Sequence, residues 1–512
     1  MGKKKNKKAA VSVPDLFGKG ITNVYLLVMF GLFPVFYPGS LIGIHTVKKE
    51  FFTISAGVYL CLMLIPFLCK ASFVFKGRER KKIDRSDIFA GLFLIAALVS
   101  TGIALNQTEA VYGNSTVQTG LIVMLLCIGS YFFVKNFAVW DKGLIWANLL
   151  ASSFIYLCGI FIACRTDILN MQKDIIDAQK AMFVSPLGNI NFNVAYISLV
   201  LPAAAVMFLL CKEVFTKRVL AAYLFVGFMD LFCLRVDSAI VMILVVFLLL
   251  IYFSFEQETW FLRCLSVIGL FFAANIAVFT LSVLLKDHMY PFNSLGALFV
   301  RTETVVLEFI FLCIFFVMQK KGNFTKERLW KGQKIYKITM FVLLGLFVVF
   351  VLALNFAFSE RVEGTLLSNL VLNDAMGSGR GYVWIRTGGR FLELPFLNQL
   401  FGCGLGCFYD FINPWYDDMV AKFGAVFYDP HNDFLQVLVT TGIVGAVGFF
   451  GMILHTMASA LKKRKNQEMF LAVFILLAAY LTQGLINSYT IFSTPILFIL
   501  LGLANSSMGN TD

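Results

Sequence analysis

Apolar residues along this chain form long uninterrupted runs and do not alternate with polar ones. Runs of about 17–25 apolar residues are long enough for a helix to cross a hydrocarbon core of about 30 Å, whereas the strands of a transmembrane barrel alternate in polarity. The pattern therefore predicts an all-α polytopic membrane protein with about fourteen transmembrane helices. The predicted spans lie near residues 21–37, 52–69, 88–105, 120–134, 143–163, 193–211, 219–234, 238–254, 264–285, 302–318, 338–358, 434–459, 469–486 and 488–504.

One connection between the predicted spans, residues 359–433, is far longer than the others. It is rich in glycine but also in aromatic residues and leucine, a composition that packs or lies at an interface and is unlike that of a disordered linker. The predicted organisation has four parts. These are a basic segment 1–20, transmembrane helices 1–11 in residues 21–358, the large loop 359–433, and helices 12–14 with the C-terminus in residues 434–512.

Composition and charge agree with a membrane protein. Hydrophobic residues make up 59% of the chain and charged residues 14%, with a mean hydropathy of +0.81, against roughly 45–50% and 25% in soluble domains. More than half of the 43 Lys and Arg residues lie in the N-terminal segment and in alternate connections. The net charge of +13 thus indicates a cytoplasmic face, not a nucleic-acid partner. Both termini are predicted to be cytoplasmic and the large loop to lie outside.

A histidine stands at the start of a late span, in YDPHNDFL. Asp429 is a good N-cap and Pro430 suits the first helical position, so His431 and Asn432 are predicted to occupy the first helical turn. The positive end of the helix dipole disfavours a protonated ring there, which keeps His431 neutral and able to act as a general base. The alternative is a polar residue that simply caps a helix at the membrane surface.

Arginines on the predicted outer side are the second candidate group. Arg380 lies among glycines in GSGRGYVW, and its guanidinium is predicted to bind a phosphate or diphosphate. Arg386 and Arg390 follow at helical spacing, so one helix face is predicted to present two or three positive charges. Arg235 lies in a short outer hairpin, where it pairs with Asp230, extends to lipid head groups, or contributes to function.

Metal chemistry has little support in the sequence. No group of His, Cys, Asp and Glu residues has the spacing of a metal site, so neither a metal nor another cofactor is predicted. Asp417 and Asp418 in WYDDMV are interpreted as a solvated turn. Cys403 and Cys407 in GCGLGC are either a disulfide or two free thiols, and the glycines there predict a tightly packed turn.

Several of these segments carry a family resemblance. DPHNDFLQVLVTTGIVGAVGF resembles the signature that opens a late helix in the O-antigen ligase and O-antigen polymerase superfamily. GRGYVWIRTGGRFLELPFLNQLFGCGLGCF resembles the block that precedes it, and LGNINFNVAY, which contains Asn191, resembles a Gly-Asn-x-Asn element. LRVDSAIVMIL is similar to a Ser-Arg element, although Leu234 stands where serine is usual.

The resemblance implies a GT-C-like glycosyltransferase of the bacterial cytoplasmic membrane that uses no metal. Its donor would be a polyprenyl-diphosphate-linked oligosaccharide and its acceptor a glycan or lipid-linked glycan, with membrane lipids as further partners. His431 would activate the acceptor hydroxyl, and Arg380 and Arg235 would hold the diphosphate. Arg386, Asn191 and Asn432 complete the predicted substrate-binding set.

Polymerisation of lipid-linked repeat units is the preferred function. Ligase-type transfer of a finished glycan to a lipid, a cell-wall polymer or a protein remains open. A flippase for lipid-linked sugars is the alternative from another class, because Arg301, Glu303 and Glu308 near one span form a possible charge path.

Overall fold

The structure is a computed structural model that describes residues 13–75, 84–292, 294–321, 324–362 and 364–509. Nine helices within these ranges are long and apolar enough to cross a membrane, and three shorter apolar helices accompany them. The prediction of an all-α polytopic membrane protein is confirmed. Much of the basic N-terminal segment and of the basic connection at residues 70–87 falls on residues 1–12 and 76–83, which lie outside the described residues.

Each of the fourteen predicted spans coincides with a described helix. The first begins at Val13, earlier than predicted, and continues into a π-helical turn, η1 (Val28–Leu32). The helices are α1 (Val13–Leu27), α2 (Ile44–Phe75), α3 (Arg85–Gly102), α5 (Leu121–Phe137), α6 (Lys142–Ala163), α8 (Ile190–Leu210), α9 (Val214–Cys233), α10 (Asp237–Ser254), α11 (Glu258–Leu284), α13 (Thr302–Lys321), α14 (Lys326–Ala357), α19 (Asp433–Lys463), α20 (Phe470–Gly484) and α21 (Thr494–Gly509).

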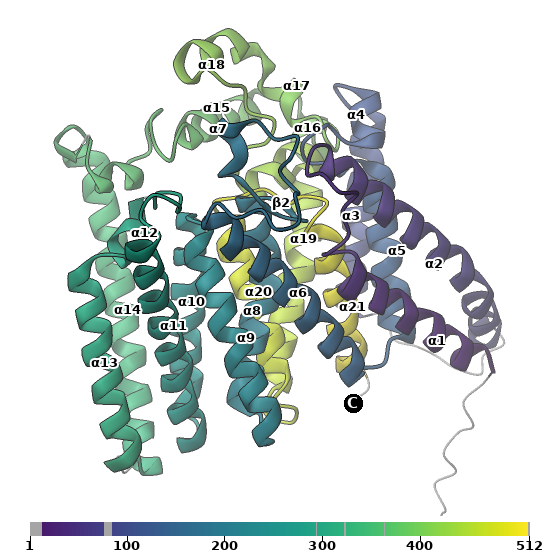
Figure 1. The fold of residues 1–512 in the computed structure, drawn as a ribbon. Coiled ribbons are helices and arrows are strands. Elements are labelled where there is room, and N and C mark those ends of the chain that lie inside the picture. Colours follow the sequence, from purple (N-terminus) through teal and green to yellow (C-terminus); the bar gives the residue numbers. More distant parts are fainter. Residues whose placement is uncertain (1–12, 76–83, 293, 322–323, 363, 510–512) are drawn as a thin grey trace, which may run out of the picture.

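The long loop folds into short helices that lie over one end of the bundle, here called the cap (residues 359–432; Figure 1). Nine buried side chains form a hydrophobic core that is separate from that of the bundle. They come from the cap and from α19, and include Tyr382, Phe391 and Phe411. The cap contains η2 (Ser359–Val362), η3 (Leu366–Leu370), α15 (Arg380–Glu393), α16 (Phe396–Phe401), α17 (Phe408–Ile412), η4 (Asn413–Trp415) and α18 (Tyr416–Phe423). The prediction of a folded loop therefore agrees with the structure.

Smaller elements join the helices on the cap side. They are α4 (Gln107–Tyr112), α7 (Asp177–Lys180), α12 (Ser294–Phe299) and the antiparallel strands β1 (Phe183–Ser185) and β2 (Gly188–Asn189). This hairpin leads directly into α8, whose N-cap is Asn189.

The helices differ in what they face. In α8, 83% of the apolar 18-residue stretch is buried inside the protein, whereas in α13 and α14 only 6% of the corresponding stretch is buried. An apolar side chain that does not face protein can face lipid at no cost, which suits α13 and α14, the least buried of these helices. The core therefore gathers around α8, α20 and the α3–α19 pair, which lie beneath the cap.

Helix α19 is broken at Gly442, where the backbone leaves helical geometry with φ 68° and ψ −171°. A Cβ at Gly442 would lie 2.3 Å from the carbonyl carbon of Leu400, and one at Gly402 would lie 2.4 Å from that of Thr440. Only glycine permits two backbones to approach this closely. The GCGLGC segment is thus the predicted packed turn, bonded to the broken helix through the Cys403 N–H and the Val439 carbonyl at 2.9 Å.

Two sequence interpretations in the cap are settled by the structure. Cys403 and Cys407 are both free and buried, so they do not form a disulfide. Asp417 and Asp418 lie in the first turn of α18, so the interpretation as a solvated turn is wrong. Acidic residues are favourable at a helix N-terminus, and Asp418 also accepts a hydrogen bond of 2.6 Å from the Tyr382 hydroxyl.

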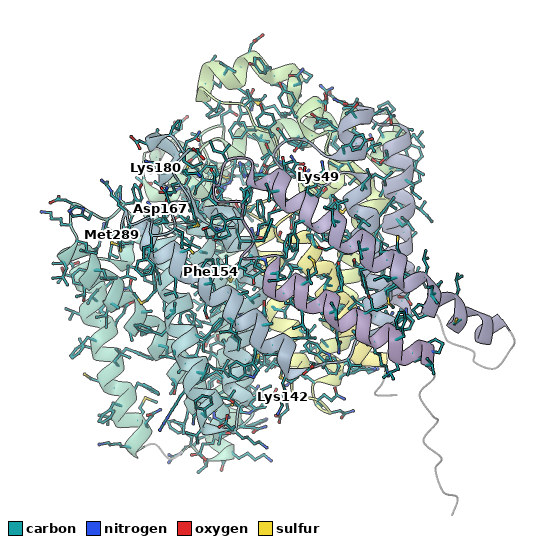
Figure 2. The ribbon with its side chains drawn as sticks, turned by 45° about the vertical axis from the view of Figure 1, so that its right-hand side comes forward. Lys49, Lys142, Phe154, Asp167, Lys180 and Met289 are labelled. Atoms are coloured by element: carbon teal, nitrogen blue, oxygen red, sulfur yellow. The ribbon has the colours of Figure 1, made fainter. Side chains whose placement is uncertain are left out.

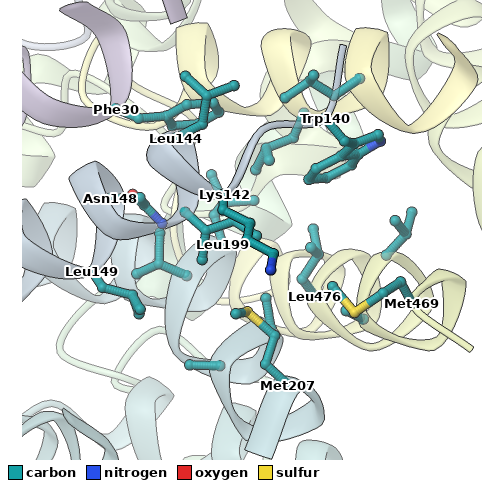
Figure 3. Close-up of a pocket in the computed structure, with 18 of the residues that line it drawn as sticks. Phe30, Trp140, Lys142, Leu144, Asn148, Leu149, Leu199, Met207, Met469 and Leu476 are labelled. Carbon is teal, nitrogen blue, oxygen red and sulfur yellow. The ribbon is translucent and has the colours of Figure 1, made fainter. Parts of the chain in front are cut away.

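A cavity of about 400 Å³ lies at the opposite end of the bundle from the cap. Its walls are almost entirely apolar, and Figure 3 shows Lys142 and Trp140 among the residues around it. Lys142 begins α6 and Met469 immediately precedes α20, so the cavity is separated from the cap by the length of these helices. It does not contribute to the site described next.

Candidate functional site

Arg380 begins α15 directly after a sharp turn. Gly377, Ser378 and Gly379 all have positive φ angles, of 57°, 60° and 95°. A Cβ on Gly379 would lie 2.8 Å from the Phe427 ring, and one on Gly381 would lie 2.0 Å from a backbone oxygen. The glycines of GSGRG therefore allow the first turn of α15 to pack tightly against the rest of the cap, which fixes where Arg380 lies.

The guanidinium of Arg380 is poorly paired within the described residues. It donates one long hydrogen bond, 3.4 Å from Nη1 to the Gly377 carbonyl, and its buried Nε–H has no hydrogen-bond acceptor there. A buried donor without a partner costs free energy, about 1–3 kcal/mol for a neutral group and more for a charged one. Arg380 thus keeps unused donor capacity in an enclosed position.

His431 does not lie on a helix, and the prediction that it occupies the first turn is wrong. Helix α19 begins at Asp433 and its N-cap is Asn432, whose side chain accepts a hydrogen bond of 3.0 Å from the Leu435 N–H. Asp429 instead accepts the His431 N–H at 2.8 Å. Asparagine is as good an N-cap as aspartate, so the helix starts later than the sequence pattern indicated.

The backbone of His431 adopts a left-handed conformation with φ 48°. Its segment is fixed by the Trp384 indole N–H, which donates to the Pro430 carbonyl at 2.8 Å. Trp384 belongs to α15, as does Arg380, so one cap helix positions both candidates. The imidazole Nδ1 lies 3.5 Å from the Asp429 carboxylate, and 32% of the histidine side chain is exposed.

Charged groups around His431 act on one another. Burial lowers the pKa of His431 below its usual value, Asp429 opposes this shift, and Arg380 adds to it. Burial also lowers the pKa of Arg380, against the effects of Asp429 and Asp237. An arginine stays protonated despite such a shift, whereas a histidine with a lowered pKa is neutral near pH 7. The group therefore combines a neutral base with a fixed positive charge.

Arg235 is 6% exposed and lies in the turn between α9 and α10, with φ 58°. Its guanidinium donates to the carbonyl groups of Cys233 and Ala181 and lies 4.9 Å from the centre of the Tyr290 ring. The predicted alternative of an ion pair with Asp230 is wrong, because neither carboxylate oxygen of Asp230 has a hydrogen-bond partner among the described residues. The guanidinium instead joins the end of α9, through Cys233, to the Ala181 carbonyl just before the β1 strand.

Arg386 lies on a different side of α15 from Arg380. Both of its terminal nitrogens bind the Asp374 carboxylate, and its guanidinium stacks on the Tyr382 ring at 3.8 Å. Arg390, one turn further, lies over the rings of Phe411 and Trp415, and its buried Nε–H also has no hydrogen-bond partner among the described residues. The expectation of one shared helix face is not met for Arg380 and Arg386, since residues six apart on a helix point in different directions.

The two candidate asparagines differ, since Asn191 has a local contact and Asn432 also bonds a distant part of the chain. The backbone N–H of Asn191 donates to the Asn189 side chain at the start of α8. The Asn432 side chain caps α19, donates to the Leu485 carbonyl at 2.9 Å, and so joins α19 to the end of α20. Asn432 is brought next to His431 by the sequence itself, whereas Asn191 is positioned by the β1–β2 hairpin.

The sequence analysis missed several residues of this region. Asp237 follows Arg235 in LRVDSA, but nothing in the pattern showed that its charge would act on Arg380. A polar face at helical spacing was visible in α19, where Asp433, Gln436 and Thr440 are each at most 2% exposed. Asp433 Oδ1 and both amide atoms of Gln436 have no hydrogen-bond partner among the described residues. The bundle beneath His431 thus has a polar interior.

Part of the chain matches a known protein family. Residues 291–450 match the model of a family described as O-antigen ligase. The matched range contains Arg380, His431 and the whole cap, but not Arg235 or Asn191. No curated protein matches the chain.

Proposed function

We propose that this protein, a membrane glycosyltransferase of the O-antigen ligase and polymerase superfamily, is a polysaccharide polymerase. The match at residues 291–450 carries the assignment to the superfamily. In the proposed reaction the growing glycan, linked to a polyprenyl diphosphate, is transferred to the next lipid-linked repeat unit. The cap would lie on the outer side of the bacterial cytoplasmic membrane, with both termini cytoplasmic, in accord with the distribution of Lys and Arg along the chain.

The proposed step forms one bond and breaks another. A hydroxyl oxygen of the acceptor sugar attacks the anomeric carbon of the donor, and the bond from that carbon to the phosphate oxygen breaks. The hydroxyl proton passes to His431, and the bonding electrons leave with the polyprenyl diphosphate. A base increases the nucleophilicity of the hydroxyl, and fixed cations stabilise the charge that develops on the leaving group.

The environment of Arg380 is the observation that carries the proposal. Its guanidinium is enclosed and keeps a donor without a partner among the described residues, and it is electrically coupled to His431. A diphosphate is the kind of ligand that a guanidinium binds with paired hydrogen bonds. Because fixed guanidinium groups would supply the positive charge, the proposed step includes no metal ion.

Arg235 is proposed as the second cation. The α9–α10 turn that carries it also carries Asp237, whose carboxylate couples to Arg380. Arg235 and a carboxylate whose charge acts on Arg380 therefore lie in the same short turn. Neutralisation from two sides suits a leaving group with two phosphates, and a water-poor position strengthens each contact.

Supporting roles are proposed for the other candidates. Asn432 would hold His431 in place through its capping hydrogen bonds, and Arg386 would fix α15 through Asp374. Asn191, half-buried at the start of α8, would contact the donor or acceptor from the bundle side. A flippase is less well supported, since the buried Glu308 carboxylate accepts a hydrogen bond of 2.8 Å from Asn275 in a local contact between helices.

The decisive experiment supplies the purified protein, in a bilayer, with a lipid-linked oligosaccharide as the only substrate. Chains that lengthen by whole repeat units are expected for a polymerase. Product that forms only after a second type of acceptor is added would contradict polymerisation and indicate a ligase. Movement of the lipid between leaflets with no new glycosidic bond would contradict both and indicate a flippase. The His431→Ala variant is the control for enzyme-dependent product.

A further inference from the structure

Two arginines share one tyrosine ring on the cap side of the bundle. The guanidinium carbon of Arg165 lies 4.9 Å from the centre of the Tyr290 ring, and that of Arg235 lies at the same distance from it. The two charges are therefore at most about 10 Å apart. Like charges this close repel, and a cation–π contact offsets only about 0.5–2 kcal/mol for each of them.

The two arginines occupy equivalent positions in the chain. Arg165 follows the end of α6 by two residues, and Arg235 follows the end of α9 by two residues. Both have left-handed backbones, with φ 51° and 58°, at a position where glycine or asparagine is the usual residue. The geometry of the turn alone would favour a smaller residue, so the turn does not account for an arginine at either place.

Acidic residues near Arg165 are engaged elsewhere. The carboxylate of Asp167 accepts the backbone N–H groups of Met171 and Gln172 at 2.9 and 2.6 Å, and Asp177 pairs with Lys180 at 2.8 Å. Among the described residues, Arg165 has no carboxylate within 4.0 Å. In Figure 2 Lys180, Asp167 and Met289, the neighbour of Tyr290, lie on the cap side of the bundle, with Lys142 at the opposite end.

We infer that Arg165 binds a phosphate group of the lipid-linked donor together with Arg235, and that Tyr290 positions both guanidinium groups. This inference rests on the proposed function. It adds to the site a residue from the α6 end, a region that the family match does not cover. Both side chains start just beyond the ends of apolar helices, at the level where the phosphates of a membrane-embedded lipid lie.

The two arginines differ in exposure, and this difference predicts different roles for them. Arg235 is 6% exposed and is fixed by two backbone carbonyls, whereas Arg165 is exposed. The ligand would therefore meet Arg165 first, from the aqueous side, and then Arg235. An incoming diphosphate relieves the repulsion between the two guanidinium groups, and this gain is available only when both are present. Each arginine is thus expected to matter more for donor affinity than for the rate of the bound complex.

The test measures binding of undecaprenyl diphosphate to the full-length protein in nanodiscs of neutral phospholipid. Arg165→Ala is expected to weaken binding about tenfold, the effect of losing one charge-assisted contact, and to raise KM for the donor with little change in kcat. Arg165→Lys keeps the charge but loses the fork and should recover only part of the affinity. Tyr290→Phe should bind normally, and Tyr290→Leu should resemble Arg165→Ala.

Arg361→Ala is the matched control. Arg361 is also an exposed arginine of the cap side stacked on an aromatic ring, 5.6 Å from the centre of Phe358, and it should bind the diphosphate as the wild type does. If Arg165→Ala fails to insert, Arg165→Lys and Tyr290→Leu supply the same comparison.

The outcomes separate three cases. Unchanged binding by Arg165→Ala in neutral nanodiscs would overturn the inference. An Arg165 effect that appears only when anionic phospholipid is added would also overturn it, because the phosphate would then belong to a membrane lipid. If the wild-type protein itself does not bind the diphosphate, the proposed function fails, and not merely the role of Arg165.

Discussion

The start and the middle of helix α15 treat their arginines in opposite ways. At its start, Arg380 has one long hydrogen bond and a buried N–H without a partner among the described residues. Two turns later, Arg386 is held by both oxygens of Asp374, which Lys422 also contacts at 3.1 Å. The same residue type on one helix is therefore left partly unpaired in one place and fully engaged in the other.

The difference distinguishes a binding site for an anion from a contact that stabilises the fold. A guanidinium bound to a carboxylate has its charge neutralised within the protein, and replacing a partner mainly changes folding stability. A guanidinium that is enclosed but not neutralised stores an unfavourable interaction that a ligand can relieve. The Arg380 end is thus suited to binding an anion, and the Asp374 cluster is suited to holding the cap helices in place.

Replacing His431 should produce the largest effect. His431→Ala removes the proposed base and is expected to lower kcat about 10²–10⁴-fold, the usual contribution of general base catalysis, while the protein still inserts and binds donor. His455→Ala is the matched control, because His455 lies near the other end of α19, 3.4 Å from Asp84. Polymer yield close to that of the wild type in the His431→Ala variant would refute the base assignment.

The contrast along α15 is tested by replacing Arg380 and Arg386, each in turn, with lysine. Arg380→Lys keeps the charge but loses the planar fork, and is expected to reduce kcat/KM about 10–100-fold. Arg386→Lys is expected to retain activity within a few-fold and to lower the free energy of unfolding by about 1 kcal/mol, since its partner Asp374 is 39% exposed.

Activity assays and thermal unfolding of the two variants give the comparison directly. Equal losses of activity in Arg380→Lys and Arg386→Lys would show that the difference in hydrogen bonding between the two arginines has no functional meaning. Arg361→Lys, elsewhere in the cap, should alter neither quantity.

Long apolar runs determined most of the helical architecture in advance, because each span must satisfy its backbone within itself and needs apolar residues along its whole length. The position of His431 relative to α19 was predicted wrongly for a local reason. DPHN offers two capping residues, Asp429 and Asn432, and the choice between them depends on contacts that the sequence does not display. One of these is the Asn432 bond to the Leu485 carbonyl, a residue 53 positions away.

The candidate site was predictable where it follows from local sequence and not where it depends on long-range contacts. GSGRG showed that Arg380 needed close packing, and the structure places it accordingly. The charge of Asp237 acts on Arg380 from more than a hundred residues away in the sequence, and no periodic pattern encodes such an effect. The contact of Arg386 with Asp374, 12 positions away, was missed because the turn between them has no regular helical spacing.

The smallest effect concerns pH, and it tests whether the group around His431 acts as one unit. Burial and Arg380 lower the pKa of His431 and Asp429 raises it, so the acid limb of the kcat/KM profile should lie below pH 6.5 in the wild type. Activity should be lost as the pH falls through that limb, because the base becomes protonated.

Two variants should move the limb in opposite directions. Asp429→Asn removes a charge that stabilises imidazolium, so the pKa of His431 should fall further and the limb should shift to lower pH. The amide oxygen can still accept the His431 N–H, which keeps the backbone in place. Arg380→Gln removes a charge that opposes protonation, so its limb should shift to higher pH even though its activity is lower throughout. Opposite shifts cannot result from a general loosening of the cap, which would expose His431 to water in both variants and move both limbs upward. Shifts in the same direction would therefore remove the electrostatic argument for a neutral base held beside a fixed cation.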